Sequence, residues 1–263
     1  MHRVLFILFL LPAAASAQFS EAIEDNSFYI EEAYNQEEGV VQHIFTGAID
    51  PTSSDLIGTF TQEWPVMSQE HQWSYTLPLL ATSFGGTGLG DVMINYRYQF
   101  WKDGNWAWMS PRFSLILPTG STASSRGLGV TGYQVNLPLS KRLSDGFILH
   151  VNAGATLYPH AEQSVAGGMV KRSVDSYFLG ASGILLLQKE MNILVEVLTT
   201  ATAQFDGSGK RSYGTSTIVS PGARWAIDVG TLQIVPGIAA PVQFSGGAAT
   251  VQIFGYLSFE HPF

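Results

Sequence analysis

Residues 91–100, DVMINYRYQF, alternate between two kinds of side chain at every position. One set of alternate positions holds Asp91, Met93, Asn95, Arg97 and Gln99, and the positions between them are all apolar or aromatic. Successive side chains point to opposite faces of a β-strand, which gives a period of two. A helical period of 3.6 does not fit this order. The stretch therefore predicts a strand with one mainly polar face and one apolar face.

The same alternation recurs in eleven further stretches, which brings the expected number of strands to twelve. They are residues 40–47, 56–64, 72–80, 109–117, 133–140, 147–157, 174–187, 191–203, 216–227, 232–242 and 249–260. Such a series is typical of a transmembrane barrel, but also of a soluble sandwich or a lipocalin-like barrel. The connections between the strands have to distinguish these folds.

The connections alternate in length. The shorter ones are residues 66–70, 102–105, 141–145, 188–190 and 228–230, and the longer, Gly- and Ser-rich ones are 48–55, 82–88, 118–128, 159–173, 204–213 and 243–247. Every connection after an odd-numbered stretch belongs to the longer set. Outer-membrane barrels have short periplasmic turns and longer external loops, whereas a soluble sandwich has no reason to keep this order. We therefore expect an all-β fold, a closed antiparallel transmembrane β-barrel of about twelve strands.

The composition excludes several classes of protein. Charged residues make up 13% of the chain, against about 25% in an ordinary soluble domain. Only 13 Lys and Arg residues and a net charge of -8 leave too little positive charge for a nucleic-acid binder. The chain has no cysteine, which excludes thiol catalysis, disulfides and cysteine-based metal sites.

The first 17 residues have the order of a secretory signal peptide. His2 and Arg3 precede an apolar run at residues 4–11, and small residues follow at 13–17. The apolar run is too short to cross about 30 Å of hydrocarbon as a helix. We expect cleavage between Ala17 and Gln18, and export into the envelope of a Gram-negative bacterium.

Residues 18–38 are acidic and also contain apolar side chains. The segment holds seven of the 21 acidic residues, and no Lys or Arg precedes them after the expected cleavage site. A solvated periplasmic tail would explain the charge. The apolar side chains favour a segment that packs into or under the barrel instead; they are Ile23, Phe28, Tyr29, Ile30 and Tyr34. Both interpretations stay open, and we expect a signal peptide at 1–17, this segment at 18–38 and the barrel at 39–263.

Aromatic residues mark two further positions. Trp101, Trp106 and Trp108 flank an expected periplasmic turn, where indole rings would lie at the lipid–water interface. The last stretch ends in phase at Phe263, and a terminal aromatic residue resembles the signal that outer-membrane barrels present to the barrel-assembly machinery. His261 and Pro262 depart from the usual pattern of the final residues. Phe263 is thus the expected assembly signal.

Several motifs together resemble one outer-membrane family. They are FYIEEAYNQ at residues 28–36, GVVQHI at 39–44, GLGDV at 88–92, PR at 111–112, LPTG at 117–120, SPG at 220–222 and VPG at 235–237. They are similar to motifs of the transporter-like family labelled MetA-pathway of phenol degradation, over nearly all of the chain after the signal peptide. The resemblance implies an outer-membrane barrel that passes small, often aromatic or hydrophobic, compounds, with no catalytic residues.

Motifs for catalysis, metals and cofactors are weak. The glycine-rich residues 85–90 lead into a strand rather than a helix, so no helix N-terminus awaits a phosphate. Ser110, Ser114 and His150 fall on inward faces of non-adjacent strands, which disfavours an outer-membrane lipid hydrolase. The histidines lack the sequence spacing of metal ligands. We expect no enzyme, no metal and no cofactor, with a lipid-modifying hydrolase and a structural barrel without transport as alternatives.

The expected function is passive uptake of small compounds through the barrel, with outer-membrane lipid and a small-molecule solute as partners and no nucleic acid. Arg97, Arg112 and Arg224 are the expected fixed positive charges of the lumen, because an arginine facing lipid at the midplane costs about 2–4 kcal/mol. The candidate lumen residues are Asp91, Asn95, Arg97, Arg112, Gln134, Asn136, His150, Asn152, Glu196 and Arg224. Neither the solute nor the oligomeric state can be read from the sequence.

Overall fold

The computed structural model describes residues 27–102, 106–165, 168–206 and 208–263. This part of the chain contains seventeen strands and one short 3₁₀ helix. In chain order they are β1 (Val40–Ile49), β2 (Leu56–Val66), β3 (Ser68–Thr82), β4 (Gly86–Leu89), β5 (Val92–Tyr98), β6 (Trp108–Met109), β7 (Arg112–Leu117), η1 (Thr122–Ser124), β8 (Gly132–Ser144), β9 (Phe147–Val165), β10 (Gly168–Gln188), β11 (Met191–Phe205), β12 (Arg211–Trp225), β13 (Ile227–Val229), β14 (Leu232–Ala239), β15 (Val242–Ser245), β16 (Ala248–Val251) and β17 (Ile253–Pro262). The expected signal peptide and its cleavage site, Ala17 and Gln18, lie outside the described residues.

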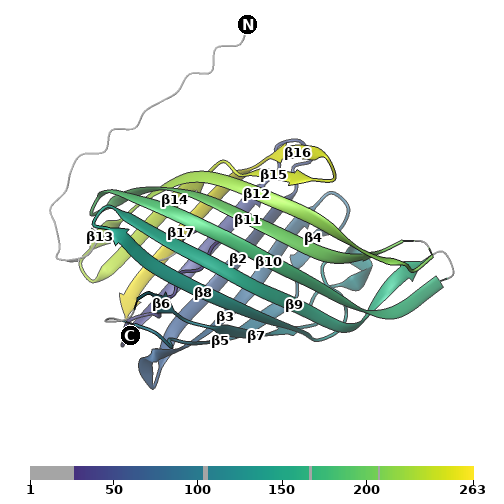
Figure 1. The fold of residues 1–263 in the computed structure, drawn as a ribbon, viewed down its shortest axis with the longest axis horizontal. Helices are drawn as coiled ribbons and strands as arrows, with labels where there is room; N and C mark the ends of the chain where they lie inside the picture. Colours follow the sequence, from purple (N-terminus) through teal and green to yellow (C-terminus); the bar gives the residue numbers. More distant parts are fainter. Residues whose placement is uncertain (1–26, 103–105, 166–167, 207) are drawn as a thin grey trace, which may run out of the picture.

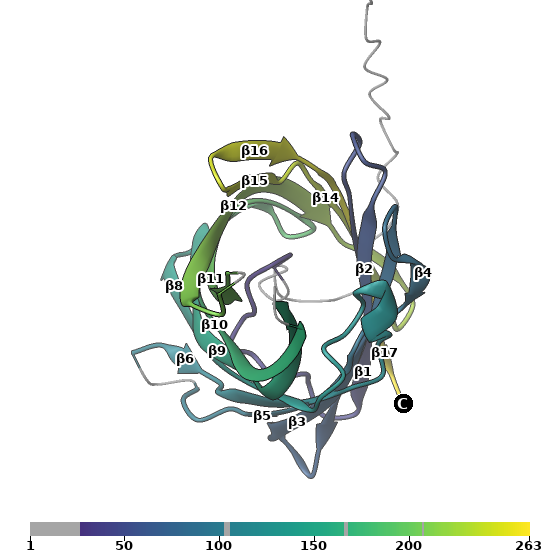
Figure 2. The same cartoon turned by 90° about the vertical axis from the view of Figure 1, so that its right-hand side faces the viewer.

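The seventeen strands form the wall of a closed antiparallel barrel of twelve strands, as the sequence predicts (Figures 1 and 2). Five of the twelve wall strands are each interrupted once, at the joins β4–β5, β6–β7, β12–β13, β14–β15 and β16–β17. The barrel closes where β1 pairs with β17, from Val40↔Pro262 to Ile49↔Ile253. No helix in the described ranges is long and apolar enough to cross a membrane.

The alternation seen in the sequence sets the two faces of the wall. In β11, Met191, Ile193 and Val195 are exposed on the outer surface, while Asn192 and Glu196 are buried. Outward apolar side chains suit lipid, and closure leaves no unpaired sheet edge, which lipid cannot satisfy with hydrogen bonds. The barrel wall therefore turns its polar face inward.

One expected external loop is largely strand. Residues 159–173 were expected to form a Gly- and Ser-rich link, yet β9 continues to Val165 and β10 begins at Gly168, which pairs with Val165. A register shift between Arg172 and Val174 interrupts the extended hairpin. Strands pair through backbone groups that every residue except proline carries in full, so a hairpin can form without alternating apolar side chains. Such pairing leaves no hydrophobic alternation for the sequence to reveal.

Candidate functional site

Residues 27–38, called the lumen segment below, enter the barrel rather than pass beneath it: residues 27–36 lie inside, and Glu37 and Glu38 are exposed. Ile30, Glu32 and Ala33 are at most 4% exposed, and the dark purple start of the described chain lies within the ring of strands in Figure 2. None of these residues belongs to a strand. The hydrogen bonds of its backbone to the wall come from wall side chains, which makes the lumen segment the most informative region of the inner surface.

Glu196 on β11 binds the start of the lumen segment. Its carboxylate accepts hydrogen bonds from the backbone N–H groups of Phe28, Tyr29 and Ile30 at 3.0–3.2 Å. The Glu196 side chain is almost fully buried. Consecutive N–H groups that converge on one anion form a backbone nest, a common anion-binding arrangement. Beside it the Ser27 hydroxyl donates to that of Ser182 at 2.8 Å.

Three wall glycines leave room for the apolar side chains of this part of the lumen segment. A Cβ atom at Gly222 would lie 2.5 Å from the Phe28 ring, and one at Gly237 would lie 2.7 Å from it. A Cβ atom at Gly180 would lie 2.3 Å from the Ile30 methyl group. Phe28 also packs against Phe254 and Tyr256, with ring centroids 5.2 and 5.4 Å apart. The wall is thus shaped to these side chains.

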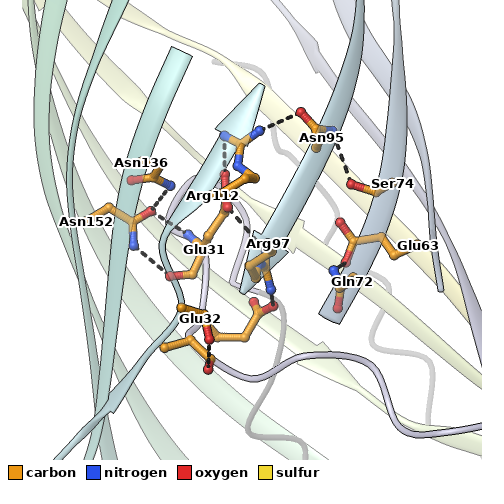
Figure 3. Close-up of polar contacts among 12 residues, drawn as sticks. Glu31, Glu32, Glu63, Gln72, Ser74, Asn95, Arg97, Arg112, Asn136 and Asn152 are labelled. Atoms are coloured by element: carbon orange, nitrogen blue, oxygen red, sulfur yellow. Dashed lines mark hydrogen bonds and ion pairs between the residues drawn. The ribbon is translucent and has the colours of Figure 1, made fainter. Parts of the chain in front are cut away.

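Two arginines bind the acidic part of the lumen segment (Figure 3). Arg97 on β5 contacts Glu32 and Glu31, each at 3.2 Å, and donates to the carbonyl oxygen of Tyr34 at 3.0 Å. Arg112 on β7 contacts the other oxygen of Glu31 at 2.7 Å. The side chains of Arg97 and Glu32 are 4% and 5% exposed. Buried charges of this kind persist because they are paired and hydrogen-bonded.

Neutral side chains complete the binding of the lumen segment. Asn152 accepts from the N–H of Glu31 at 2.8 Å and donates to its carbonyl oxygen at 2.7 Å, which imitates strand pairing. Ser140 accepts from the N–H of Ala33 and Ser110 donates to its carbonyl oxygen, both at 2.7 Å. Farther along, Gln99 and Gln72 accept from the N–H groups of Asn35 and Gln36. Wall side chains therefore satisfy the segment's backbone in several places along its length.

The candidate residues from the sequence fall into three places. Around the lumen segment lie Glu196, Arg97, Arg112, Asn152, Asn95, Gln134, Asn136 and His150. Asn95 and Gln134 accept from Arg112, Asn136 donates to Asn152, and the His150 ring packs edge-on against Tyr34. Arg224 is fully buried on the inner face of β12 and donates to Asn192 at 3.0 Å. Asp91 lies apart, between β4 and β5, where it accepts from the N–H groups of Gly120 and Leu128 in the β7–β8 loop. Asp91 thus binds a loop, a contact that alternation does not reveal.

Two contact residues, Gln72 and Ser182, were not singled out from the sequence. Both lie on the polar faces of their strands, and Gln72 donates to Glu63 at 2.7 Å. Applying the alternation to every strand would have found them.

Trp108 does not lie at the lipid interface as expected. Its ring packs edge-on against Tyr34 of the lumen segment, with centroids 5.1 Å apart. Trp108 lies two positions before the buried Ser110, and side chains two positions apart on a strand point to the same face, so the Trp108 ring points inward. Trp106 remains 69% exposed and lies under the ammonium group of Lys141.

A serine and a histidine meet inside the barrel, although not the pair considered from the sequence. Ser140 and His150 lie on adjacent strands, and the Ser140 oxygen is 2.6 Å from Nδ1 of His150. Both are fully buried beneath Ala33 and Tyr34. A nucleophile needs access to its substrate, so this geometry favours a structural role over catalysis.

Comparison with known proteins gives outer-membrane barrels. The fold is similar to the COG4313 outer membrane channel from Pseudomonas putida F1, at 13% identity, a TM-score of 0.63 and coverage of 91% of this chain and 100% of that one. It is also similar to the NanC porin (8% identity, TM-score 0.55, 84% and 100% covered) and to the KdgM porin in complex with disordered oligogalacturonate (13%, 0.50, 85% and 99%).

No family model and no curated protein matches the sequence, so the MetA-pathway family name stays an expectation. At these identities the similarity concerns the fold. The chain is a β-barrel of the bacterial outer membrane, of the kind that channels and porins use.

Proposed function

We propose that the protein is an outer-membrane channel for passive uptake of small compounds, and that the lumen segment gates it. The observation that carries the proposal is the way this segment is held. Its backbone is bound by wall side chains and none of its residues joins a strand. It can therefore leave the lumen without breaking a single strand pair, whereas moving any wall strand would open the barrel.

Departure of the lumen segment would change the charge that a solute meets. Arg97 and Arg112 are now paired with Glu31 and Glu32. When the acidic segment leaves, both guanidinium groups face the lumen without these partners. Glu63 on β2, which is bonded to Gln72, is then an acidic side chain of the wall on this side of the lumen (Figure 3). We propose that these arginines, with Arg224, set the selectivity of the open state.

The resemblance to the MetA-pathway family supports small aromatic or hydrophobic compounds as the solutes. Phe263 is 73% exposed, and its N–H donates to the carbonyl oxygen of Gly39 beside the barrel seam. An exposed terminal aromatic residue suits recognition by the assembly machinery, which we propose as its role.

A disulfide lock tests the gate, because the chain contains no native cysteine. The hydroxyl oxygens of Ser27 and Ser182 are 2.8 Å apart, so Ser27→Cys with Ser182→Cys would tie the lumen segment to β10. We expect the oxidised double variant, in planar bilayers, to conduct less than the parent barrel and to regain conductance with a reductant. Ser182→Cys alone is the matched control, and it should not respond to the reductant.

The outcomes separate the alternatives. Equal conductance in the locked and reduced forms would contradict gating by this segment but leave a channel. An absence of conductance and of solute flux in the parent, the reduced variant and a chain lacking residues 18–38 would contradict the channel itself. It would favour a structural barrel.

A further inference from the structure

Two histidines meet at the seam where the barrel closes. His43 lies near the start of β1 and His261 near the end of β17. Val41 is paired with His261 and His43 with Phe259, so the two histidines are diagonal neighbours across the strand pair. Their Nε2 atoms are 3.3 Å apart, and both side chains are partly exposed.

The pair lies on the outer face of the barrel, apart from the lumen segment. Gln42 and Glu260, the next residues on each strand, bond to one another on the inner side of the same seam. Phe45 and Phe60 flank the histidines on the outside, and the His43 ring stacks on Phe60 with centroids 6.3 Å apart. The short turns of the barrel and both ends of its wall are on this side, so the pair lies at the periplasmic rim.

The hydrogen bond of His261 prepares its ring for a metal ion. Its Nδ1 atom is 2.8 Å from the backbone carbonyl oxygen of Pro262. A carbonyl oxygen only accepts, so Nδ1 carries the proton and the neutral ring keeps its lone pair on Nε2, toward His43. Donation of the second ring N–H to a carbonyl group is the arrangement that orients metal-bound histidines.

The spacing of the two nitrogen atoms fits one ion between them. Zinc–nitrogen bonds of 2.0–2.1 Å at a tetrahedral angle place the two nitrogen atoms roughly 3.3–3.4 Å apart. The two rings are stacked, with centroids 5.3 Å apart, so the His43 ring needs to rotate until its lone pair points at the ion. The terminal torsion of histidine has a broad minimum, which permits this rotation, while the His261 ring keeps its bond to Pro262. No group of three or more His, Asp or Glu side chains in the described ranges is placed to hold a metal. Water would complete the coordination.

We propose that His43 and His261 bind one divalent transition-metal ion that bridges the first and last strands of the barrel. Imidazole ligands select Zn²⁺, Cu²⁺ or Ni²⁺ over Mg²⁺ and Ca²⁺, which prefer oxygen. The ion joins β1 to β17 and stabilises the closed barrel, since a ligand that binds the folded state alone shifts the unfolding equilibrium toward it.

Metal titration of the refolded chain without a histidine tag tests the site. In isothermal titration with ZnCl₂ in a non-chelating buffer near pH 7.5, we expect one equivalent to bind. His43→Gln and His261→Gln should each weaken binding by at least about tenfold. His71→Gln is the matched control, because His71 is another outward histidine, bonded to Tyr96 instead, and its loss should leave the affinity unchanged.

Copper resonance gives a readout that general weakening of the fold would not produce. The electron paramagnetic resonance spectrum of bound Cu²⁺ should show coupling to two imidazole nitrogen atoms in the parent and to one in either single variant. Folded outer-membrane barrels migrate faster on gels than the unfolded chain. Zinc should raise the temperature at which the fast-migrating form is lost, in the parent and in His71→Gln only. Binding that is absent in the parent, or equal in all four proteins, would overturn the proposal, while the disulfide test of the gate would stand.

Discussion

At Glu196 the barrel wall supplies the charge and the lumen segment supplies backbone N–H groups, whereas at Arg97 and Arg112 both partners contribute charged side chains. The Glu196 contact needs only a main chain in the right conformation. The arginine contact needs Glu31 and Glu32 in particular. The start of the lumen segment is therefore held through its backbone conformation, and residues 31–32 are held through their charged side chains.

The two contacts also differ in what remains when one partner is lost. Removing Arg97 leaves the buried Glu32 carboxylate without its guanidinium partner, which is a costly state. Replacing Glu196 with Gln keeps one oxygen that accepts hydrogen bonds, but it removes the charge and turns the other oxygen into an NH2 donor. The difference predicts an order of effects.

The largest effect is expected from Arg97→Gln. Breaking a buried ion pair costs about 3–5 kcal/mol, so the lumen segment should leave the wall in most molecules. A glutamyl endopeptidase should then cleave after Glu31 and Glu32, and bilayer conductance should rise. Arg97→Lys, which keeps the charge but not the forked geometry, should fall in between. A segment as protected in Arg97→Gln as in the parent would contradict the role of the arginine contact.

Glu196→Gln should have a smaller effect. Hydrogen bonds to a charged group contribute about 1.5–3 kcal/mol, and the amide keeps part of this. We expect modest protease cleavage and a smaller rise in conductance than in Arg97→Gln. If Glu196→Gln released the lumen segment more readily than Arg97→Gln, the order proposed for the two contacts would be reversed.

Gly180→Ala tests the fit of the wall to the lumen segment without any change in charge. The added methyl group would meet the Ile30 side chain, and overpacking of this kind costs about 1–3 kcal/mol. Protease protection of the segment should fall. Ile30→Ala in the same chain should restore it by removing the clash. If the second change adds to the loss instead, the clash is not the cause.

Ser27→Ala should have the smallest effect. It removes one neutral hydrogen bond, to Ser182, and such bonds contribute about 0.5–1.5 kcal/mol. Conductance should stay close to that of the parent, and the thermal transition of the refolded barrel should shift by little. A large rise in conductance would show that the lumen segment is held mainly at this end.

The period-two pattern is enough to predict most of the barrel wall. Wall strands pair through backbone groups that every residue carries, so the side chains need only sort into lipid-facing and lumen-facing sets. That sorting places Arg97, Arg112 and Glu196 on polar faces before any contact is known. The aromatic-belt expectation fails at Trp108, because it turns the indole ring outward, whereas parity with Ser110 turns it inward, as the structure has it.

Alternation and loop parity are local properties, and they sufficed to indicate a closed twelve-stranded outer-membrane barrel and the polarity of its lumen. The docking of residues 27–38 and the meeting of His43 with His261 depend on closure of the barrel. His43 and His261 are 218 positions apart, so no local sequence pattern relates them. They become neighbours only because the last strand pairs with the first. For the same reason, the sequence alone is equally compatible with a solvated tail and with a packed segment at residues 18–38. The tertiary structure decides for residues 27–36, because the closed wall brings Arg97, Arg112 and Glu196 to them as partners.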